Sequence, residues 1–297
     1  MPRIARLSGA RMPDFLAVGP PRTATTWLEY MIEGHVTLPR GIKETDFFGG
    51  NFDLGTDWYL SHFADCSPGR PVGEICPTYF DSALARERIA ASVPKCRIIC
   101  TLRDPVARIY SHYRLLRHEG LAAEPFERVL ERHRRASGAG TLLVSSRYAT
   151  HLEQWHRMFG ERNVLVLIHD DLEADPQAFL GRVCELLEIA PISIEQAPDA
   201  GGRVNRIERA PRSRHLAKSA RRLKMHLIRQ RHYRTLAALQ PLWDFCAGGG
   251  APFPTLNPEL EIILREELLP EIVRLEKMLG RGLGAWKQPT ELRCKAP

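Results

Sequence analysis

Residues 19–27, G-P-P-R-T-A-T-T-W, have the composition of an anion-binding turn. An apolar run precedes them and a segment of helical period follows, which predicts a strand, a tight turn and a helix N-terminus. Unpaired backbone N–H groups and the positive end of the helix dipole meet at such a junction and favour a bound phosphate group. Thr23 and Ala24 are small enough for the backbone to approach an anion. We expect Thr25 and Thr26 to cap the helix and to donate hydroxyl hydrogen bonds.

This turn departs from the loop of nucleoside-triphosphate-binding proteins, G-x-x-x-x-G-K-[ST]. The second glycine and the Lys-Ser/Thr pair of that loop are both missing here. The turn therefore suits an anion but not the usual magnesium-triphosphate geometry, which argues against a kinase or a GTPase. Taken alone, the segment is also compatible with a simple turn between a strand and a helix.

A second anion site is indicated at Arg103 and Ser111. An apolar run ends at Leu102, and Asp104 and Pro105 fit the N-cap and the first position of a helix. Ser111 then lies two turns beyond Asp104 on the same helix face, so Arg103 and Ser111 can converge on one anion. The alternatives are an ion pair between Arg103 and a nearby acid, and an ordinary helix hydroxyl at Ser111.

Alternating strands and helices must position these residues. Short apolar runs begin at Phe15, Cys96 and Asn163 and alternate with longer segments of helical period, which favours a parallel sheet covered on both faces. A run from Pro71, with a shorter one from Val36, would complete the sheet. We therefore expect an α/β, P-loop-like fold of three layers with a central four- to five-stranded parallel sheet flanked by helices. Right-handed crossovers place the C-terminal strand ends, and hence the site, on one edge.

Helical periodicity predicts the remaining elements. Helices are expected over residues 25–33, 82–92, 105–118, 126–135, 147–159 and 175–188. A further helix opens at Asn257 and Pro258, ends at Gly280, and should pack back on the core. Its apolar face consists of Leu260, Ile263, Leu264, Leu268, Ile272, Leu275 and Leu279. Because no repeat or low-complexity linker divides the chain, residues 1–297 are expected to form a single domain.

Composition narrows the class of protein. A chain of 297 residues with 44% hydrophobic content can bury the core of a large α/β domain. The net charge of +7 favours anionic partners, such as a nucleotide, an acidic glycan, nucleic acid or a membrane surface. Seven cysteines without a C-x-x-C pair favour a reducing compartment and no metal site. The N-terminus lacks the apolar stretch of a signal peptide or spanning helix, so we expect a cytoplasmic protein without a membrane span.

The segment 203–234 stands apart because it contains twelve Arg or Lys residues and the single acid Glu208. We expect a basic, partly helical and mobile segment outside the sheet. It could close over a phosphate group, attract an acidic acceptor, or form a solvated surface. Nucleic acid is the rival partner, but the segment has no recognised nucleic-acid-binding motif and Tyr233 is its only aromatic residue, so we expect no nucleic-acid binding.

Four motifs in order resemble those of the sulfotransferases that use 3'-phosphoadenosine 5'-phosphosulfate (PAPS), in particular the heparan-sulfate-type and bacterial branch. The turn at 19–27 resembles the 5'-phosphosulfate loop of this family, and K-E-T-D-F-F from Lys43 resembles its K-E-x-x-F-F segment. G-E-I-C-P-T-Y-F from Gly73 is similar to its G-E-x-x-P-x-Y segment, and L-R-D-P-V-A-R-I-Y-S-H-Y from Leu102 to its 3'-phosphate motif. Weaker similarity continues to the C-terminal helix, so the resemblance covers most of the chain outside the basic segment.

The resemblance implies transfer of a sulfuryl group from PAPS to a hydroxyl, or less readily an amine, by in-line displacement that releases 3',5'-ADP without a metal. The protein must then align the reactants, stabilise charge and accept the acceptor's proton. By position in the motifs, the nucleotide-binding residues would be Pro21, Arg22, Thr23, Ala24, Thr25, Thr26, Trp27, Arg103 and Ser111, with Arg209 and Arg212 of the basic segment closing over the nucleotide.

Three residues are implied as catalytic. Glu44 matches the glutamate of K-E-x-x-F-F and is the candidate base, with His35 and His112 as alternatives. Lys43 would neutralise the transferring group or merely pair with Glu44. Arg22 stands where many relatives carry lysine, and because arginine keeps its proton at any working pH, it would stabilise the leaving phosphate rather than protonate it.

Four further residues are candidates for binding the acceptor: Glu74, Tyr79, Phe47 and Phe48. Glu74 could instead support its neighbours, and buried aromatic residues commonly belong to the core. Ile75 falls where heparan-type relatives often place a lysine, which weakens the case for a heparan acceptor. Small-molecule, lipid and glycan acceptors all stay open, as does the oligomeric state.

Two residues have alternative roles. Trp27 could pack its helix or stack on the nucleotide. Tyr148 resembles a family tyrosine near the cleft, but a buried hydrogen-bonded tyrosine fits equally well. At the level of the whole chain, two alternative functions remain: a divergent P-loop nucleotide-dependent kinase, which would require magnesium and ATP, and a basic polyanion-binding module without catalysis.

Overall fold

The computed structural model describes residues 10–63, 66, 69–136, 141–196, 207–247 and 249–290. The chain forms two compact units. The first comprises Met1–Leu102 and Gln154–Asn205, and the second comprises Arg103–Glu153 and Arg206–Pro297. Within the described ranges, no helix has the length and apolar character needed to cross a membrane.

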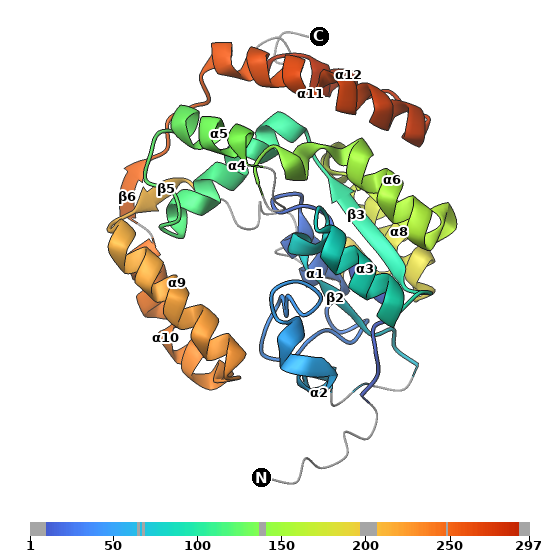
Figure 1. The fold of residues 1–297 in the computed structure, drawn as a ribbon. Helices are drawn as coiled ribbons and strands as arrows, with labels where there is room; N and C mark the ends of the chain where they lie inside the picture. The colour runs from blue at the N-terminus through green and yellow to red at the C-terminus, as the bar shows by residue number, and fades with distance from the viewer. Residues whose placement is uncertain are drawn as a thin grey trace. The chain divides into compact units, whose positions relative to one another are not determined.

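The first unit contains a four-stranded parallel sheet (Figure 1). Its strands are β1 (Phe15–Ala17), β2 (Gly73–Ile75), β3 (Arg97–Leu102) and β4 (Val164–Ile168), in the order β2-β1-β3-β4. Strands that are covered on both faces bury nearly every side chain, which is why these segments were recognisable as continuous apolar runs. The predicted α/β fold with a parallel sheet is confirmed, with four strands.

The run from Val36 does not form a fifth strand. It contributes only isolated bridges, Glu33 to Val36 and Thr37 to Val72. The Thr37 N–H donates to the Pro71 carbonyl at 2.8 Å, and a parallel ladder would next need an N–H from the residue two positions on. That residue is Pro39, which has no N–H to donate, so the pairing ends there.

Helices cover both faces of this sheet. On one face, α1 (Thr25–Ile32) and α8 (Pro176–Leu187) pack with alternate strand residues into one hydrophobic core, where the ring of Trp27 meets the ring of Phe179 edge-on at 5.7 Å. On the other face lies α3 (Ala83–Ser92) (Figure 1). The unit also contains α2 (Gly55–Leu60), α7 (His169–Ala174) and the C-terminal half of α6 (Tyr148–Phe159). Short 3-10 turns occur at Phe52–Leu54, Ser61–Phe63, Pro77–Tyr79, Val144–Ser146, Glu161–Asn163 and Ile194–Gln196.

The second unit is mainly helical. Its helices are α4 (Pro105–His118), α5 (Phe126–Arg135), the start of α6, α9 (Arg214–Arg229), α10 (Tyr233–Ala247), α11 (Pro258–Leu279) and α12 (Gly284–Lys287). An antiparallel pair of short strands, β5 (Arg209–Pro211) and β6 (Gly249–Pro252), joins the two ends of the α9–α10 hairpin. The C-terminal helix α11 packs against α4.

The basic segment is partly helical and lies outside the parallel sheet, as predicted. Residues 203–206 of this segment lie outside the described residues. The remainder forms β5, all of α9 and the first residues of α10. Whether the segment moves, and whether the chain acts as one domain, stay predictions.

Candidate active site

The turn between β1 and α1 has an unusual backbone. Arg22 and Ala24 both have left-handed conformations, with φ of 78° and 73°. Residues other than glycine rarely adopt this conformation, and they do so mainly at functional sites where the surroundings hold them. Ala24 is the N-cap of α1, and its side chain accepts no hydrogen bond.

The expected capping by Thr25 and Thr26 was therefore wrong. The helix begins one residue earlier than a threonine cap requires, so both threonines are already helical. The first turn of α1 also contains no acidic residue. A helix N-terminus that lacks both a capping side chain and a carboxylate retains its preference for an external anion.

Thr23 holds the turn against the sheet. Its side chain is fully buried, and its hydroxyl donates to the Pro20 carbonyl at 2.7 Å and shares a hydrogen bond of 2.8 Å with Thr101 Oγ1. Gly19 is needed at the same place, because a Cβ there would lie 2.4 Å from Thr101 Oγ1. This packing fixes the backbone that carries Arg22 and Ala24.

Lys43 lies at the start of α1. Its ammonium donates to Thr26 Oγ1 at 2.5 Å and pairs with the Glu29 carboxylate at 3.1 Å. Burial raises the pKa of Glu29, and the neighbouring Lys43 lowers it again in part. Among the described residues, the acid that pairs with Lys43 is therefore Glu29 and not Glu44, and Lys43 brings a positive charge to the start of α1.

The segment that carries Glu44 is attached to β2 through Glu74. The Glu74 side chain is fully buried, and its Oε1 accepts hydrogen bonds from the Thr45 N–H and the Thr45 hydroxyl, both at 2.7 Å. Its Oε2 accepts from the Tyr59 hydroxyl at 3.2 Å. Burial raises the pKa of the Glu74 carboxyl to about 7, although the hydrogen bonds from Thr45 lower it. Glu44 itself, the residue before Thr45, is half-buried.

The three aromatic residues predicted to line an acceptor pocket are in the core. Phe47, Phe48 and Tyr79 are at most 2% exposed. Phe47 stacks on Tyr59 at 4.5 Å between ring centroids, and Phe48 meets Tyr79 edge-on at 5.8 Å. A contact with the acceptor stays a prediction for them and for Glu74.

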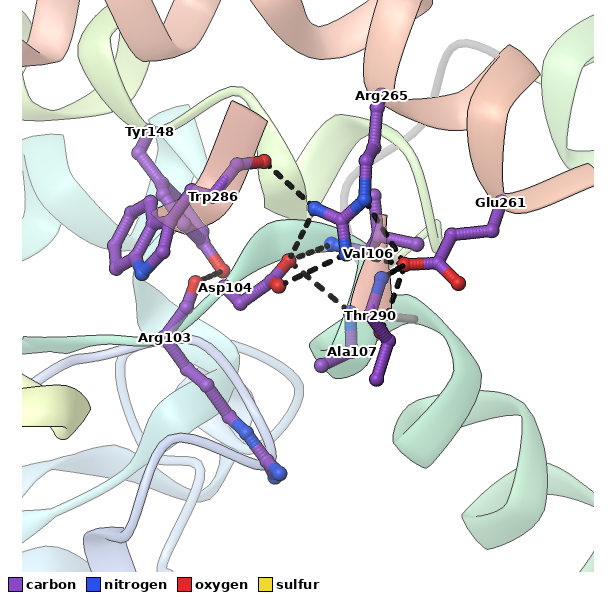
Figure 2. Close-up of polar contacts among 9 residues, drawn as sticks. All are labelled: Arg103, Asp104, Val106, Ala107, Tyr148, Glu261, Arg265, Trp286 and Thr290. Carbon is purple, nitrogen blue, oxygen red and sulfur yellow. Dashed lines mark hydrogen bonds and ion pairs between the residues drawn. The ribbon is translucent and has the colours of Figure 1, made fainter. Parts of the chain in front are cut away.

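The segment with the second expected anion site, Arg103 and Ser111, starts immediately after β3. Asp104 caps α4 by accepting from the N–H groups of Val106 at 2.9 Å and Ala107 at 3.3 Å, and Pro105 is the first helical residue, as predicted. Tyr148 donates its hydroxyl to the Arg103 carbonyl at 2.9 Å, which fixes the backbone at Arg103 (Figure 2). The sequence left the role of Tyr148 open, and the structure shows a buried, hydrogen-bonded tyrosine.

A buried ion cluster supports Asp104 from the other side. Arg265 of α11 pairs with Asp104 at 3.2 Å and with Glu261 at 2.5 Å, and it donates to the Trp286 carbonyl at 2.6 Å (Figure 2). Asp104 therefore pairs with Arg265 rather than with Arg103. The half-buried Arg103 guanidinium points away from this cluster and makes no hydrogen bond or ion pair with any described residue, so it is available to an anion (Figure 2).

The comparison with protein families decides the class. The model of the sulfotransferase domain matches residues 12–200, a range that contains all four motifs. The chain belongs to this family. The predicted resemblance is thereby confirmed, as is the prediction of an enzyme, and the match favours a sulfotransferase over the kinase and the binding module.

Two curated relatives illustrate the similarity. The mouse protein "bifunctional heparan sulfate N-deacetylase/N-sulfotransferase 4" is 33% identical over 197 residues, which cover 61% of this chain and 23% of that protein. The human protein "bifunctional heparan sulfate N-deacetylase/N-sulfotransferase 3" is 33% identical over 198 residues, again 61% of this chain and 23% of the relative. This sulfotransferase chain thus matches about a quarter of the length of these relatives.

A solved structure extends the similarity to the fold. The sulfotransferase from Alicyclobacillus acidocaldarius superposes with a TM-score of 0.67 at 19% identity, covering 94% of this chain and 100% of that chain. The P-loop-like α/β fold expected for this sulfotransferase is therefore confirmed.

The other predicted nucleotide-binding residues of this sulfotransferase differ in how far they are buried. Trp27 is 6% exposed and packs in the core, and Ser111 is half-buried on α4. Arg209 and Arg212 are exposed at the β5–β6 pair, where Arg209 donates to the Gly250 carbonyl at 3.4 Å. Their contact with a nucleotide stays a prediction.

Sequence reasoning missed two groups of supporting residues. The first is the pair Thr45 and Tyr59, which donate hydrogen bonds to the Glu74 carboxylate. No regular spacing in the sequence links either residue to Glu74. The second is the pair Glu261 and Arg265. Opposite charges four residues apart on a predicted helix fit a surface pair equally well, so their spacing alone gave no sign that they are buried.

Proposed function

We propose that this sulfotransferase transfers the sulfuryl group of PAPS to a hydroxyl or amine acceptor, with 3',5'-ADP as the leaving product. The turn at residues 19–27 is the observation that carries the proposal. It joins two left-handed residues to a helix N-terminus with no acid in its first turn, in a member of the sulfotransferase family. PAPS is the donor substrate and supplies the sulfuryl group.

The residues present fit an adenine nucleotide with phosphate groups at both ends. The helix N-terminus, the permanently charged Arg22 and the nearby Lys43 suit the phosphosulfate. Arg103 has an anion-binding guanidinium without a partner among the described residues, and with Ser111 it suits the 3'-phosphate. Both sets offer hydrogen-bond donors and positive charge, as a polyanionic nucleotide requires.

Three side chains would share the chemistry. Glu44 takes the proton that the acceptor loses as its oxygen or nitrogen bonds to sulfur. Arg22 stabilises the charge left on the phosphate oxygen when the bond from sulfur to that oxygen breaks, and it keeps its own proton throughout. Lys43, held on Thr26, adds positive charge where the transferring group passes.

Calorimetry with 3',5'-ADP and 5'-AMP tests nucleotide binding. We expect 3',5'-ADP to bind more tightly than 5'-AMP, because only 3',5'-ADP carries the 3'-phosphate. Arg103→Ala should weaken 3',5'-ADP binding by about 10- to 100-fold and change 5'-AMP binding little, since a hydrogen-bonded charge pair contributes roughly 1.5–3 kcal/mol. No binding of 3',5'-ADP at high micromolar concentration would refute the proposal.

The acceptor atom is tested with labelled PAPS and matched acceptors. An amino sugar with a free amine and its N-acetylated counterpart differ only at nitrogen. Label on both sugars identifies hydroxyl transfer, and label on the free amine alone identifies amine transfer. The relatives named above are N-sulfotransferases, and Ile75, buried at 1% exposure, replaces the lysine that heparan-type relatives often carry, so lipid and small-molecule acceptors belong in the same panel.

A further inference from the structure

Glu74 is an ionisable side chain in the interior of the first unit. It lies in the middle of β2, with none of its surface exposed. A buried carboxylate is costly unless hydrogen bonds or an opposite charge satisfy it. Among the described residues, Glu74 contacts no cation, and its hydrogen-bond partners are Thr45, Tyr59 and Tyr79. The hydrogen bonds from these three residues are therefore what offsets the cost of burying the Glu74 carboxylate.

The bonds to Glu74 converge on the segment that carries Glu44. Oε1 accepts from both the N–H and the hydroxyl of Thr45 at 2.7 Å. The Tyr79 hydroxyl lies 3.4 Å from each carboxylate oxygen and accepts a hydrogen bond from the Phe48 N–H at 3.2 Å. Two backbone amides of the segment, at Thr45 and Phe48, are thus connected to one carboxylate, directly or through one hydroxyl.

The Thr45 side chain strengthens this attachment. Its hydroxyl also accepts from the Phe47 N–H at 3.2 Å, and its carbonyl accepts from the Asn51 side chain at 2.7 Å. Thr45 is itself fully buried. The residue directly after Glu44 is therefore fixed on its N–H, its carbonyl and its side chain.

The same bonds leave Glu74 no capacity for an acceptor. An ionised carboxylate has about four lone-pair positions, and the hydroxyls of Thr45, Tyr59 and Tyr79 together with the Thr45 N–H occupy them. With no exposed surface, the side chain also offers no face to a bound molecule. The alternative that Glu74 supports its neighbours fits these contacts better than a contact with acceptor hydroxyls.

We infer that Glu74 is a positioning residue that fixes the backbone of Glu44 through Thr45 and does not contact the acceptor. The inference rests on the proposed function, because it takes Glu44 as the base. A base displaced by about 1 Å can cost on the order of 100-fold in rate, so the attachment has a kinetic consequence.

Substitutions at both ends of the attachment test this inference. Glu74→Leu removes every acceptor, whereas Glu74→Gln keeps an oxygen that can accept from Thr45. We expect Glu74→Leu to lower kcat by about 10- to 100-fold with little change in the KM for PAPS or in 3',5'-ADP affinity, and Glu74→Gln to recover most of the lost turnover. Thr45→Val, which removes only the hydroxyl, should lie between them.

A matched control exists in the second unit. Thr290 donates its N–H at 2.9 Å and its hydroxyl at 2.8 Å to Oε1 of the buried Glu261, the same arrangement as Thr45 on Glu74. Thr290 is exposed whereas Thr45 is fully buried, so Thr290→Val should lower the melting temperature less than Thr45→Val does, and it should leave kcat unchanged. Hydrogen exchange at residues 43–48 provides a readout without turnover: Glu74→Leu and Thr45→Val should speed exchange of the Thr45 amide, and Thr290→Val should not.

Different outcomes identify different failures. If Glu74→Gln loses as much turnover as Glu74→Leu while the KM for the acceptor rises, Glu74 contacts the acceptor and the inference is wrong. Unchanged kcat in Thr45→Val, despite faster exchange of its amide, would also overturn it.

If the wild type binds no 3',5'-ADP and transfers no label, the proposed function fails instead. Unchanged exchange at residues 43–48 in the variants would then refute the attachment of this segment to Glu74 as well. If Glu74→Leu does not fold, Thr45→Val and Glu74→Gln carry the test.

Discussion

Glu44 and Glu74 differ in exposure, and this difference suits them to different roles. Glu44 is half-buried and can meet a second reactant, whereas Glu74 is enclosed. We predict that Glu44→Gln lowers turnover by at least about 100-fold, because a positioned base contributes roughly 100- to 10,000-fold, while 3',5'-ADP binding is retained. Turnover with labelled PAPS and calorimetry with 3',5'-ADP measure the two effects. Full activity in this variant would show that another residue is the base, and His35 and His112 are the alternative candidates.

Glu74 also makes stability depend on pH. Its pKa is raised to about 7 in the folded protein, whereas the unfolded chain releases this proton near its ordinary value of 4.5. Between these values the native state binds more protons, so the free energy of unfolding falls as pH rises from about 5 to 7, by up to about 3 kcal/mol. The groups facing Glu74 do not offset this, because Asp46 raises its pKa further and burial keeps Tyr59, Tyr79 and Cys76 neutral.

Urea unfolding at pH 5, 6, 7 and 8 checks the sign. The wild type should become less stable across this range, and Glu74→Gln should have a flatter profile because its amide does not titrate. Parallel profiles for the two proteins would show that the pKa of Glu74 in the folded protein is not raised into this pH range.

Single residues also show where sequence reasoning was limited. The apolar face predicted for the C-terminal helix included Ile263, which is 49% exposed, and excluded Glu261 and Arg265, which are buried. The buried face is shifted because Arg265 reaches Asp104, a partner 161 residues away. Likewise, Glu74 could be recognised by its motif, but Thr45 and Tyr59 could be assigned to it only once β2, α2 and the Glu44 segment were folded together.

At the scale of elements, the ion cluster connects the N-terminal part of α11 to the start of α4. Arg265, Asp104 and Glu261 are each at most 5% exposed. Arg265→Ala would leave two buried carboxylates without their cation, and we predict a loss of about 3–5 kcal/mol in the free energy of unfolding. Chemical unfolding monitored by circular dichroism measures this loss.

Arg274 on the same helix is the matched control. Its pairs with Glu153 at 2.7 Å and Glu271 at 2.9 Å involve a guanidinium that is 44% exposed. Arg274→Ala should therefore cost less than about 1 kcal/mol. Equal losses in the two variants would mean that burial of the cluster does not determine its contribution.

Elements with local start and stop signals were predicted well. Helices α4 and α5 have the predicted bounds, and α11 begins after the Asn257 cap and ends at Gly280, which has a left-handed φ of 62°. Short elements without such signals were missed. Helix α7 follows β4 with no intervening turn residue, and β5 and β6 are separated in the sequence by the whole α9–α10 hairpin, so neither has a local pattern.

At the scale of the whole molecule, the positive charge is unevenly distributed. Residues 207–247 contain ten Lys or Arg and two acids, a net charge of +8, so the rest of the chain carries −1 against the total of +7. Most of these residues lie on α9 and α10. The sequence located this charge but not the hairpin that presents it, in which α9 and α10 pack against each other across the short turn at residues 230–232.

This distribution predicts how the protein binds a polyanion. Like charges within about 10 Å of one another reinforce their potential at 0.1 M salt, so clustered charges on α9 should dominate retention on immobilised heparin. We expect the triple substitution Arg214→Gln, Lys218→Gln and Arg222→Gln to lower the eluting salt concentration strongly.

A second triple variant on α5 separates position from total charge. Replacing Arg128, Arg132 and Arg135 by Gln removes the same number of charges, but each of these arginines already pairs with Glu131 or Glu124. Its elution should shift less, because Glu131 and Glu124 beside these arginines cancel part of their field at the surface. If both triple variants elute at the same salt concentration, net charge alone governs retention and the hairpin has no special part in attracting anionic partners.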